Sequence, residues 1–195
     1  MSVPADSDAK QPRFKIDALR ADDTDAITQA AALLVGAFPH WLPTMELARD
    51  EVMEALEADR ICLVARADDQ ILGWIGGIPE YSHAWELHPL MVRADARRIG
   101  VGASLVRALE ERAQEAGALT LYLGTDDDGP APGTSAGGVE LFPGVLAHAT
   151  RLRVFDHPAG FYMRQGFEIV GLIPDANGPG KPEILMAKRL NTSTR

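Results

Sequence analysis

Apolar residues recur along the chain at two spacings, one typical of β-strands and the other of amphipathic helices. Short apolar or alternating runs, which predict strands, cover residues 14–19, 61–67, 71–78, 85–92, 119–123, 167–172 and 184–187. Helical spacing predicts helices over residues 26–34, 45–56, 101–116, 145–152 and 158–166. This order predicts an α+β (mixed α/β) fold, in which helices flank a mixed, mostly antiparallel sheet rather than a doubly wound parallel one.

The predicted strand over residues 85–92 carries two polar side chains. Glu86 and His88 share one face of this strand, because alternate strand residues point the same way. A carboxylate on an apolar strand is unfavourable unless it is solvated or paired. Glu86 could therefore be a general base, acting directly or through a water, or it could be a simple salt-bridge partner.

Pro89 interrupts the same strand. Because proline has no N–H to donate, prolines within sheets lie at edges or bulges. A break here would splay the strand from its neighbour and free the backbone of Leu90, Met91 and Val92 for an extended, amide-bearing ligand such as pantetheine. The Leu90 N–H could then donate to a thioester oxygen as it becomes an oxyanion. The alternative is an edge-strand proline without function.

A turn with the pattern Arg97-x-x-Gly100-x-Gly102 leads into the next predicted helix. Free N–H groups at a helix N-terminus suit a pyrophosphate, and glycines also mark ordinary turns. A dinucleotide-binding motif is excluded because Leu105 stands where a third small residue is needed, and a P-loop Gly-Lys-Ser/Thr is absent. The candidate phosphate-binding groups are the guanidinium groups of Arg97 and Arg98 and the backbone N–H groups near the start of the helix, from Ile99, Gly100, Val101, Gly102 and Ala103.

Aromatic and acidic residues supply the remaining candidates. Tyr162 has a hydroxyl that needs a partner when buried and could protonate a departing thiolate, although packing alone would also explain it. Trp41, Trp74, Tyr81 and Trp85 could wall a sugar-binding cleft, although at least two of them are expected to belong to the core. Asp126 and Asp127 follow a predicted strand, where they would form either a solvated turn or an ammonium-binding patch.

Composition narrows the classes of partner. The chain has 195 residues, 46% of them hydrophobic, and a formal charge of −9. This negative charge argues against a nucleic-acid partner and is compatible with a cationic substrate.

No apolar run reaches the roughly 18 residues needed to span a membrane. Residues 1–12 resemble a flexible tail without the apolar segment of a signal peptide, so we expect a cytoplasmic protein. The single cysteine, Cys62, is expected to be buried, and the Gly- and Pro-rich residues 129–138 to form a mobile loop.

Taken together, the strand, the Arg-x-x-Gly-x-Gly turn, the helix and the later Phe161-Tyr162-x-x-x-Gly166-Phe167 resemble the GNAT superfamily of N-acetyltransferases. The resemblance covers about residues 13–190, which we treat as one domain. Further segments resemble one branch of aminoglycoside 6′-N-acetyltransferases, namely Trp85-Glu-Leu-His-Pro-Leu90, Leu121-Tyr-Leu-Gly-Thr-Asp-Asp127, His157-Pro158 and Pro174-Asp-Ala-Asn-Gly178 with Lys181-Pro182.

This resemblance implies acetyl-CoA as cosubstrate, no metal, direct transfer to a 6′-amine of an antibiotic, and a homodimer. It implies Glu86 as the base-side carboxylate with His88 beside it, Leu90 N–H as oxyanion donor, and Tyr162 near the cofactor sulfur. The segment between Asp128 and Asp156, rich in Gly, Pro and Ala, departs from the family pattern. In such enzymes this segment and the region of Trp41 shape the acceptor pocket, which leaves the drug spectrum open. Two alternatives stay open as well: an acetyltransferase for a polyamine or a basic protein, and a non-catalytic acyl-CoA sensor.

Overall fold

The computed structural model describes residues 14–190 of the chain. The predicted tail over residues 1–12 therefore lies outside the described residues. The strands are β1 (Lys15–Ala18), β2 (Ile61–Ala67), β3 (Gln70–Ile78), β4 (Ala84–Val92), β5 (Thr120–Asp126), β6 (Glu168–Ile173) and β7 (Glu183–Arg189). The helices are α1 (Thr24–Ala37), α2 (Met45–Glu54), α3 (Val101–Glu115), α4 (Val145–Thr150) and α5 (Ala159–Arg164), with a 3₁₀ turn η1 (Ala94–Ala96).

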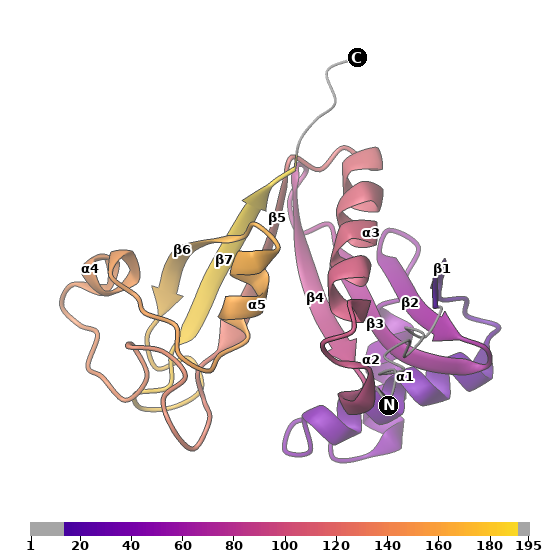
Figure 1. The fold of residues 1–195 in the computed structure, drawn as a ribbon, viewed down its shortest axis with the longest axis horizontal. Coiled ribbons are helices and arrows are strands. Elements are labelled where there is room, and N and C mark those ends of the chain that lie inside the picture. Colours follow the sequence, from indigo (N-terminus) through magenta and orange to yellow (C-terminus); the bar gives the residue numbers. More distant parts are fainter. Residues whose placement is uncertain (1–13, 191–195) are drawn as a thin grey trace, which may run out of the picture.

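The strands form a 7-stranded sheet in the order β1-β2-β3-β4-β5-β7-β6. Its strand pairs are antiparallel apart from β4–β5, which is parallel. The predicted mixed, mostly antiparallel sheet with flanking helices is therefore confirmed. Figure 1 shows β1–β4 with α1–α3 on one side of the parallel pair, and β5–β7 with α4 and α5 on the other.

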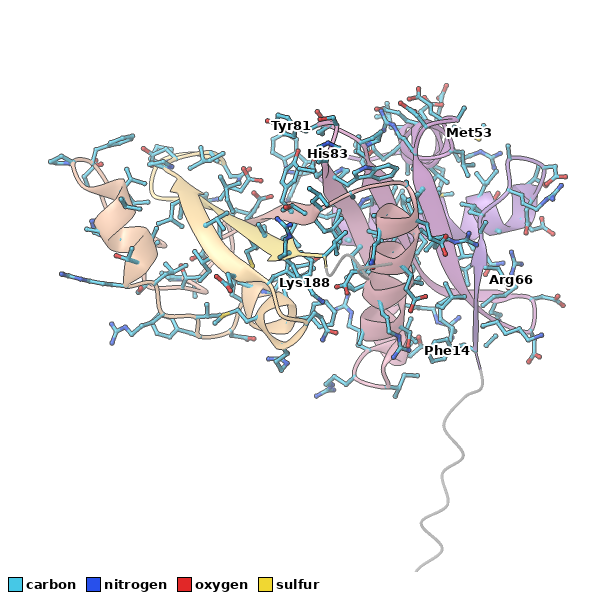
Figure 2. All side chains as sticks on the ribbon, turned by 90° about the horizontal axis from the view of Figure 1, so that it is seen from above. Phe14, Met53, Arg66, Tyr81, His83 and Lys188 are labelled. Atoms are coloured by element: carbon cyan, nitrogen blue, oxygen red, sulfur yellow. The ribbon has the colours of Figure 1, made fainter. Side chains whose placement is uncertain are left out.

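Helices cover the two faces of the sheet unequally. Asp23 and Thr44 cap α1 and α2 by accepting hydrogen bonds from the N–H groups of Ala26 (3.0 Å) and Leu47 (3.3 Å). Both helices bury their apolar sides against a cluster around Trp74 on one face. The apolar side of α3 packs on the opposite face, where its cluster extends to Tyr162 and Phe167. In Figure 2, α3 lies on one side of the sheet, while Tyr81 and His83 lie on the other.

The break predicted at Pro89 is present as a bulge between β3 and β4. The strand register shifts between Ile75 and Gly77, so Gly76 lies opposite His88 and Pro89. A Cβ on Gly76 would overlap the carbonyl oxygen of His88, which means that only glycine allows this close approach of the two backbones.

The parallel pairing between β4 and β5 is short. It comprises three pairs, Ala84–Thr120, Trp85–Leu121 and Glu86–Tyr122. Beyond Glu86 the two strands diverge, and Figure 1 shows them meeting at one end and separating toward the other. The sheet is thus splayed at its centre, as the sequence predicts.

One predicted strand end is wrong. β5 extends beyond the predicted end at Leu123 and finishes at Asp126, because antiparallel pairing with β7 continues to Glu183. The segment over residues 129–138 lies outside the helices and strands, as predicted, and it is held by Asp127 and by a bridge between Thr134 and Val154. Among residues 14–190, no helix is long and apolar enough to cross a membrane.

Candidate active site

The splay leaves part of the β4 backbone without a neighbouring strand. The Arg93 N–H points toward β3, because it donates to the Leu72 carbonyl (2.8 Å). In an antiparallel pair, the N–H groups of successive residues point alternately toward the partner strand and away from it. With Leu90 opposite Ile75, this alternation turns the N–H groups of Leu90 and Val92 toward β5, where pairing has already ended. These two groups are therefore available to an extended ligand.

Met91 does not share this position. It lies opposite Trp74, so its backbone faces β3, and its side chain is buried in the cluster beneath α1 and α2. Met91 therefore offers no free backbone group on the side of β5, because successive strand residues turn their backbone groups to opposite edges, and its predicted role in cofactor binding stays a prediction.

The turn before α3 presents unpaired backbone N–H groups. Arg98 and Gly100 have positive φ angles of 64° and 94°, and the helix N-terminus has no side-chain cap. Such a concavity at a helix N-terminus favours a phosphate group. The Arg97 Nε donates to the Val92 carbonyl (3.2 Å), which ties the turn to the open end of β4. The turn and the free strand groups thus lie along one path and fit the pyrophosphate and pantetheine of an acyl-CoA.

Tyr162 lies on the same side of the sheet as this turn. Its ring is buried between Phe161 and Phe167, with centroid separations of 5.1 and 5.7 Å. Burial raises the pKa of the Tyr162 hydroxyl to about 12, so this group keeps its proton at neutral pH. The hydroxyl therefore carries a proton that it can give to a strongly basic group, although the raised pKa also makes it a weaker acid than an exposed tyrosine.

Glu86 occupies the opposite face, at the last paired position of β4. Burial raises the pKa of its carboxyl, Glu80 adds to that rise, and His88 opposes it. Its strand partner is Tyr122, whose pKa is raised to about 12 chiefly by burial and also by Glu86. A half-buried carboxylate with a raised pKa is a better proton acceptor than an exposed one.

His88 contacts a residue that the sequence did not single out. Its Nε2 lies 3.5 Å from Oε1 of Glu51 on α2. This contact raises the pKa of His88 and lowers the pKa of Glu51, and Glu86 also favours the charged imidazole. Glu86 and His88 do share one face, as predicted, and α2 adds a carboxylate to it.

Aromatic side chains border this face. Tyr81 packs against Tyr122 at a centroid separation of 6.2 Å and remains 66% exposed. Trp41 follows α1 and is 72% exposed. Tyr81 thus lies beside the strand partner of Glu86, while Trp41 lies in the segment between α1 and α2, and both stay predictions for binding an acceptor substrate.

A second carboxylate missed by the sequence analysis is Glu183. It pairs with Asp126 across β5 and β7, and its carboxylate lies over Gly124, where a Cβ would overlap it. Burial raises the pKa of Glu183, and the charges of Asp126 and Glu86 raise it further. Asp126 stays exposed and accepts a hydrogen bond from the Asn177 amide (2.6 Å). The face beside Glu86 is consequently acidic.

Asp127 does not belong to this acidic face. It is 5% exposed, and its carboxylate accepts hydrogen bonds from the Gly133 N–H (2.7 Å), the Thr134 N–H (2.9 Å) and the Thr134 hydroxyl (2.7 Å). Because the carboxylate is buried and accepts these three hydrogen bonds, the structure does not bring Asp127 together with the exposed acidic residues, and its role in binding an ammonium group stays a prediction. Its position shows that it holds the segment after β5.

Replacement of Asp127 tests this structural role. Asp127→Ala leaves three polar groups of the segment unpaired and is expected to cost about 3 kcal/mol of unfolding free energy. The melting temperature should then fall by roughly 6–12 °C, measured by circular dichroism. Asp128→Ala is the matched control, since Asp128 is exposed. Equal melting temperatures of the two variants would contradict this role.

Two other cavities lie away from Glu86. One of about 460 Å³ is bordered by the β2–β3 turn, Arg93 and Ile99, and one of about 660 Å³ lies between β1 and α3.

Burial raises the pKa of the Cys62 thiol to about 12, which makes it inert as a nucleophile. Among residues 14–190, no group of three or more His, Cys, Asp or Glu side chains is arranged to hold a metal.

Comparison with known proteins assigns this geometry to a family. The acetyltransferase (GNAT) family profile matches residues 27–131, a span that contains Glu86, the bulge at Pro89 and the turn before α3. The chain belongs to the GNAT family of acetyltransferases. It is therefore an acetyltransferase with acetyl-CoA as its acetyl donor, and the turn and open strand described above fit that donor.

Solved structures extend the likeness over most of the chain. An aminoglycoside 6′-N-acetyltransferase complexed with coenzyme A is 34% identical, with a TM-score of 0.85, and the match covers 91% of this chain and 97% of that one. The aminoglycoside 6′-N-acetyltransferase from Enterococcus faecium is also 34% identical over the same shares, with a TM-score of 0.83. An aminoglycoside 6′-acetyltransferase type Ii is 32% identical, with a TM-score of 0.71, over 91% and 97% of the two chains. A search of curated proteins gave no match.

Proposed function

We propose that this GNAT acetyltransferase transfers the acetyl group of acetyl-CoA to a primary amine of an aminoglycoside, at the 6′ position. The observation that carries the proposal is the half-buried Glu86, with its raised pKa, on the open acidic face beside the splay. Similarity to three aminoglycoside 6′-acetyltransferases at 32–34% identity supports the choice of acceptor.

The proposed chemistry is direct attack within a ternary complex. An aminoglycoside ammonium first loses a proton to Glu86, and the free amine nitrogen then attacks the thioester carbon. The Leu90 N–H donates to the thioester oxygen while negative charge builds on it. As the carbon–sulfur bond breaks, the Tyr162 hydroxyl protonates the sulfur. The attacking nitrogen then loses its second proton, which restores the neutral tyrosine and leaves the N-acetyl amide and the free thiol of coenzyme A.

The acidic face supports a polycationic acceptor. Four more carboxylates lie close enough to interact with this site, namely Glu51, Glu80, Glu183 and Asp126. Glu80 raises the pKa of Glu86, Glu51 raises the pKa of His88, and Asp126 raises the pKa of Glu183. Such a field concentrates cations and is screened by salt over about 10 Å at 0.1 M. We include Trp41 and Tyr81 as side walls for the sugar rings, because both are exposed aromatic side chains and Tyr81 packs against Tyr122, the strand partner of Glu86.

A substrate panel tests the proposed acceptor. Thiol release from acetyl-CoA is measured with kanamycin-type aminoglycosides, spermidine and a lysine-rich peptide. The expected result is the highest kcat/KM with the aminoglycosides, falling as salt rises from 0.05 to 0.5 M. Preference for spermidine or the peptide would assign a different amine. Coenzyme A binding by calorimetry without thiol release for any amine would favour an acyl-CoA sensor.

We also propose a homodimer, which the family resemblance implies. Exposed apolar side chains support it: Val170 and Ile173 lie on β6, Leu146 lies on α4, and Phe142 lies just before α4. Analytical ultracentrifugation is expected to give twice the mass of one chain, and a monomer at micromolar concentration would contradict the proposal. The compartment that we propose is the cytoplasm.

A further inference from the structure

We infer that His157 is a positioning residue: it fastens the start of α5 to the end of β5 and so sets where Tyr162 stands. This inference rests on the role proposed above for Tyr162. The sequence resemblance includes His157 without giving it a task, and the mechanism above does not use it.

The imidazole of His157 makes one hydrogen bond with each nitrogen. Its Nε2 lies 2.8 Å from the backbone carbonyl of Asp126, and its Nδ1 lies 3.1 Å from the backbone N–H of Ala159. Because a carbonyl only accepts and an N–H only donates, Nε2 donates to Asp126 and Nδ1 accepts from Ala159. The two bonds span from the last residue of β5 to the first residue of α5.

α5 depends on such a fastening. It has six residues and no side-chain cap other than the His157 ring, and helices this short are not stable by themselves. Its other end is fixed by Gly166, which has a φ of 88°, and by the buried Phe167, whose N–H donates to the Tyr162 carbonyl (3.1 Å). His157 is thus the polar anchor at the N-terminal end.

α5 also contacts the donor-binding turn. A Cβ on Gly102, in the first turn of α3, would lie 3.2 Å from the Phe161 ring, so Phe161 packs directly on this glycine. Tyr162 follows Phe161 and contacts its ring edge to face. A shift of α5 would therefore move the Tyr162 hydroxyl relative to the end of α3.

The segment after β5 supports the imidazole from behind. A Cβ on Gly133 would lie 2.8 Å from Cδ2 of His157, which shows how closely the segment packs on the ring. Asp127 holds Gly133 in that place through its hydrogen bond of 2.7 Å. Among the described residues, the His157 ring nitrogens bond only to protein backbone, so His157 acts through Tyr162 rather than on the substrates.

Three substitutions separate the two bonds. His157→Phe removes both and keeps a ring. His157→Asn keeps an acceptor near the place of Nδ1, and His157→Gln keeps a donor near the place of Nε2. His148→Phe is the matched control, since His148 is half-buried on α4 and belongs to no part of the proposed machinery.

We expect His157→Phe to lower kcat by about tenfold, because small misplacements of a reacting group are costly, with KM for the amine within about twofold. His157→Asn and His157→Gln should each recover part of this loss. In a Tyr162→Phe background, His157→Phe should change kcat by less than about twofold, since residues that act through one another are not additive. A purely structural role would instead give the same tenfold loss in both backgrounds and would overturn the inference.

A readout without turnover keeps this inference separate from the proposed function. With Tyr81→Phe and Tyr122→Phe, 3-fluorotyrosine labels Tyr162 alone, and its ¹⁹F resonance reports the surroundings of the ring. His157→Phe should shift or broaden this resonance, and His148→Phe should not. Should Tyr162→Phe prove fully active, the proton-donor role fails while the resonance still decides the position of Tyr162. An unmoved resonance in His157→Phe would overturn the inference.

Discussion

Glu86→Gln is expected to lower kcat/KM for the amine acceptor at least tenfold, since a positioned general base contributes about 10²–10⁴-fold. The amide keeps the size and polarity of the side chain but cannot take the proton of the substrate ammonium. Coenzyme A affinity, measured by calorimetry, should change by less than about twofold, because the groups that we propose for binding the donor are the β4 backbone beyond the bulge and the turn before α3.

The pH dependence gives a second measure of the same substitution. Burial raises the pKa of Glu86, so the acid limb of kcat/KM should lie above the ordinary carboxyl range near 4.5. Activity is present when Glu86 is deprotonated and is lost as the pH falls through its raised pKa. Glu86→Gln should abolish this limb, whereas Glu168→Gln, on exposed β6, should leave both rate and limb unchanged. Wild-type turnover in Glu86→Gln would remove Glu86 from the mechanism.

Tyr162→Phe is expected to lower kcat roughly tenfold or more, because the departing thiolate then lacks its proton donor. The phenyl ring keeps its contacts with Phe161 and Phe167, so the melting temperature and the coenzyme A affinity should stay close to those of the wild type. Steady-state kinetics with a saturating amine separates this loss of kcat from any change in KM.

The control for Tyr162→Phe lies on the same helix. Met163→Leu changes a neighbouring side chain that is 48% exposed and should leave kcat unchanged. If Tyr162→Phe retains both the wild-type kcat and the wild-type pH profile, the hydroxyl has no part in proton transfer and Tyr162 serves in packing alone.

The features that the sequence predicts well are those encoded locally. The alternation of β4 places Glu86 and His88 on one face, and Pro89 marks the break, because both effects arise within a few consecutive residues. The turn before α3 is likewise recognisable from its glycines and its position between a strand and a helix. The mixed sheet follows from the order of such local elements.

The features that the sequence does not reveal depend on contacts between distant segments. Asp127 is adjacent to Asp126 and of the same type, yet one is buried and the other exposed, since the segment at Gly133 and Thr134 folds back onto only one of them. Glu51 and Glu183 reach the candidate site from α2 and β7, and no short-range pattern links either residue to Glu86. The strand end at Asp126 was missed because pairing with β7, rather than apolar alternation, extends β5.

The brief parallel contact between β4 and β5 leaves the end of β4 with candidate groups on both faces of the sheet. The turn before α3 and Tyr162 lie on one face, while Glu86 and Tyr81 lie on the other. In the proposed mechanism, the thioester and the amine therefore approach from opposite faces. The fold itself therefore imposes no order of substrate binding. A compulsory order in the kinetics would require that binding of one substrate changes the binding site of the other.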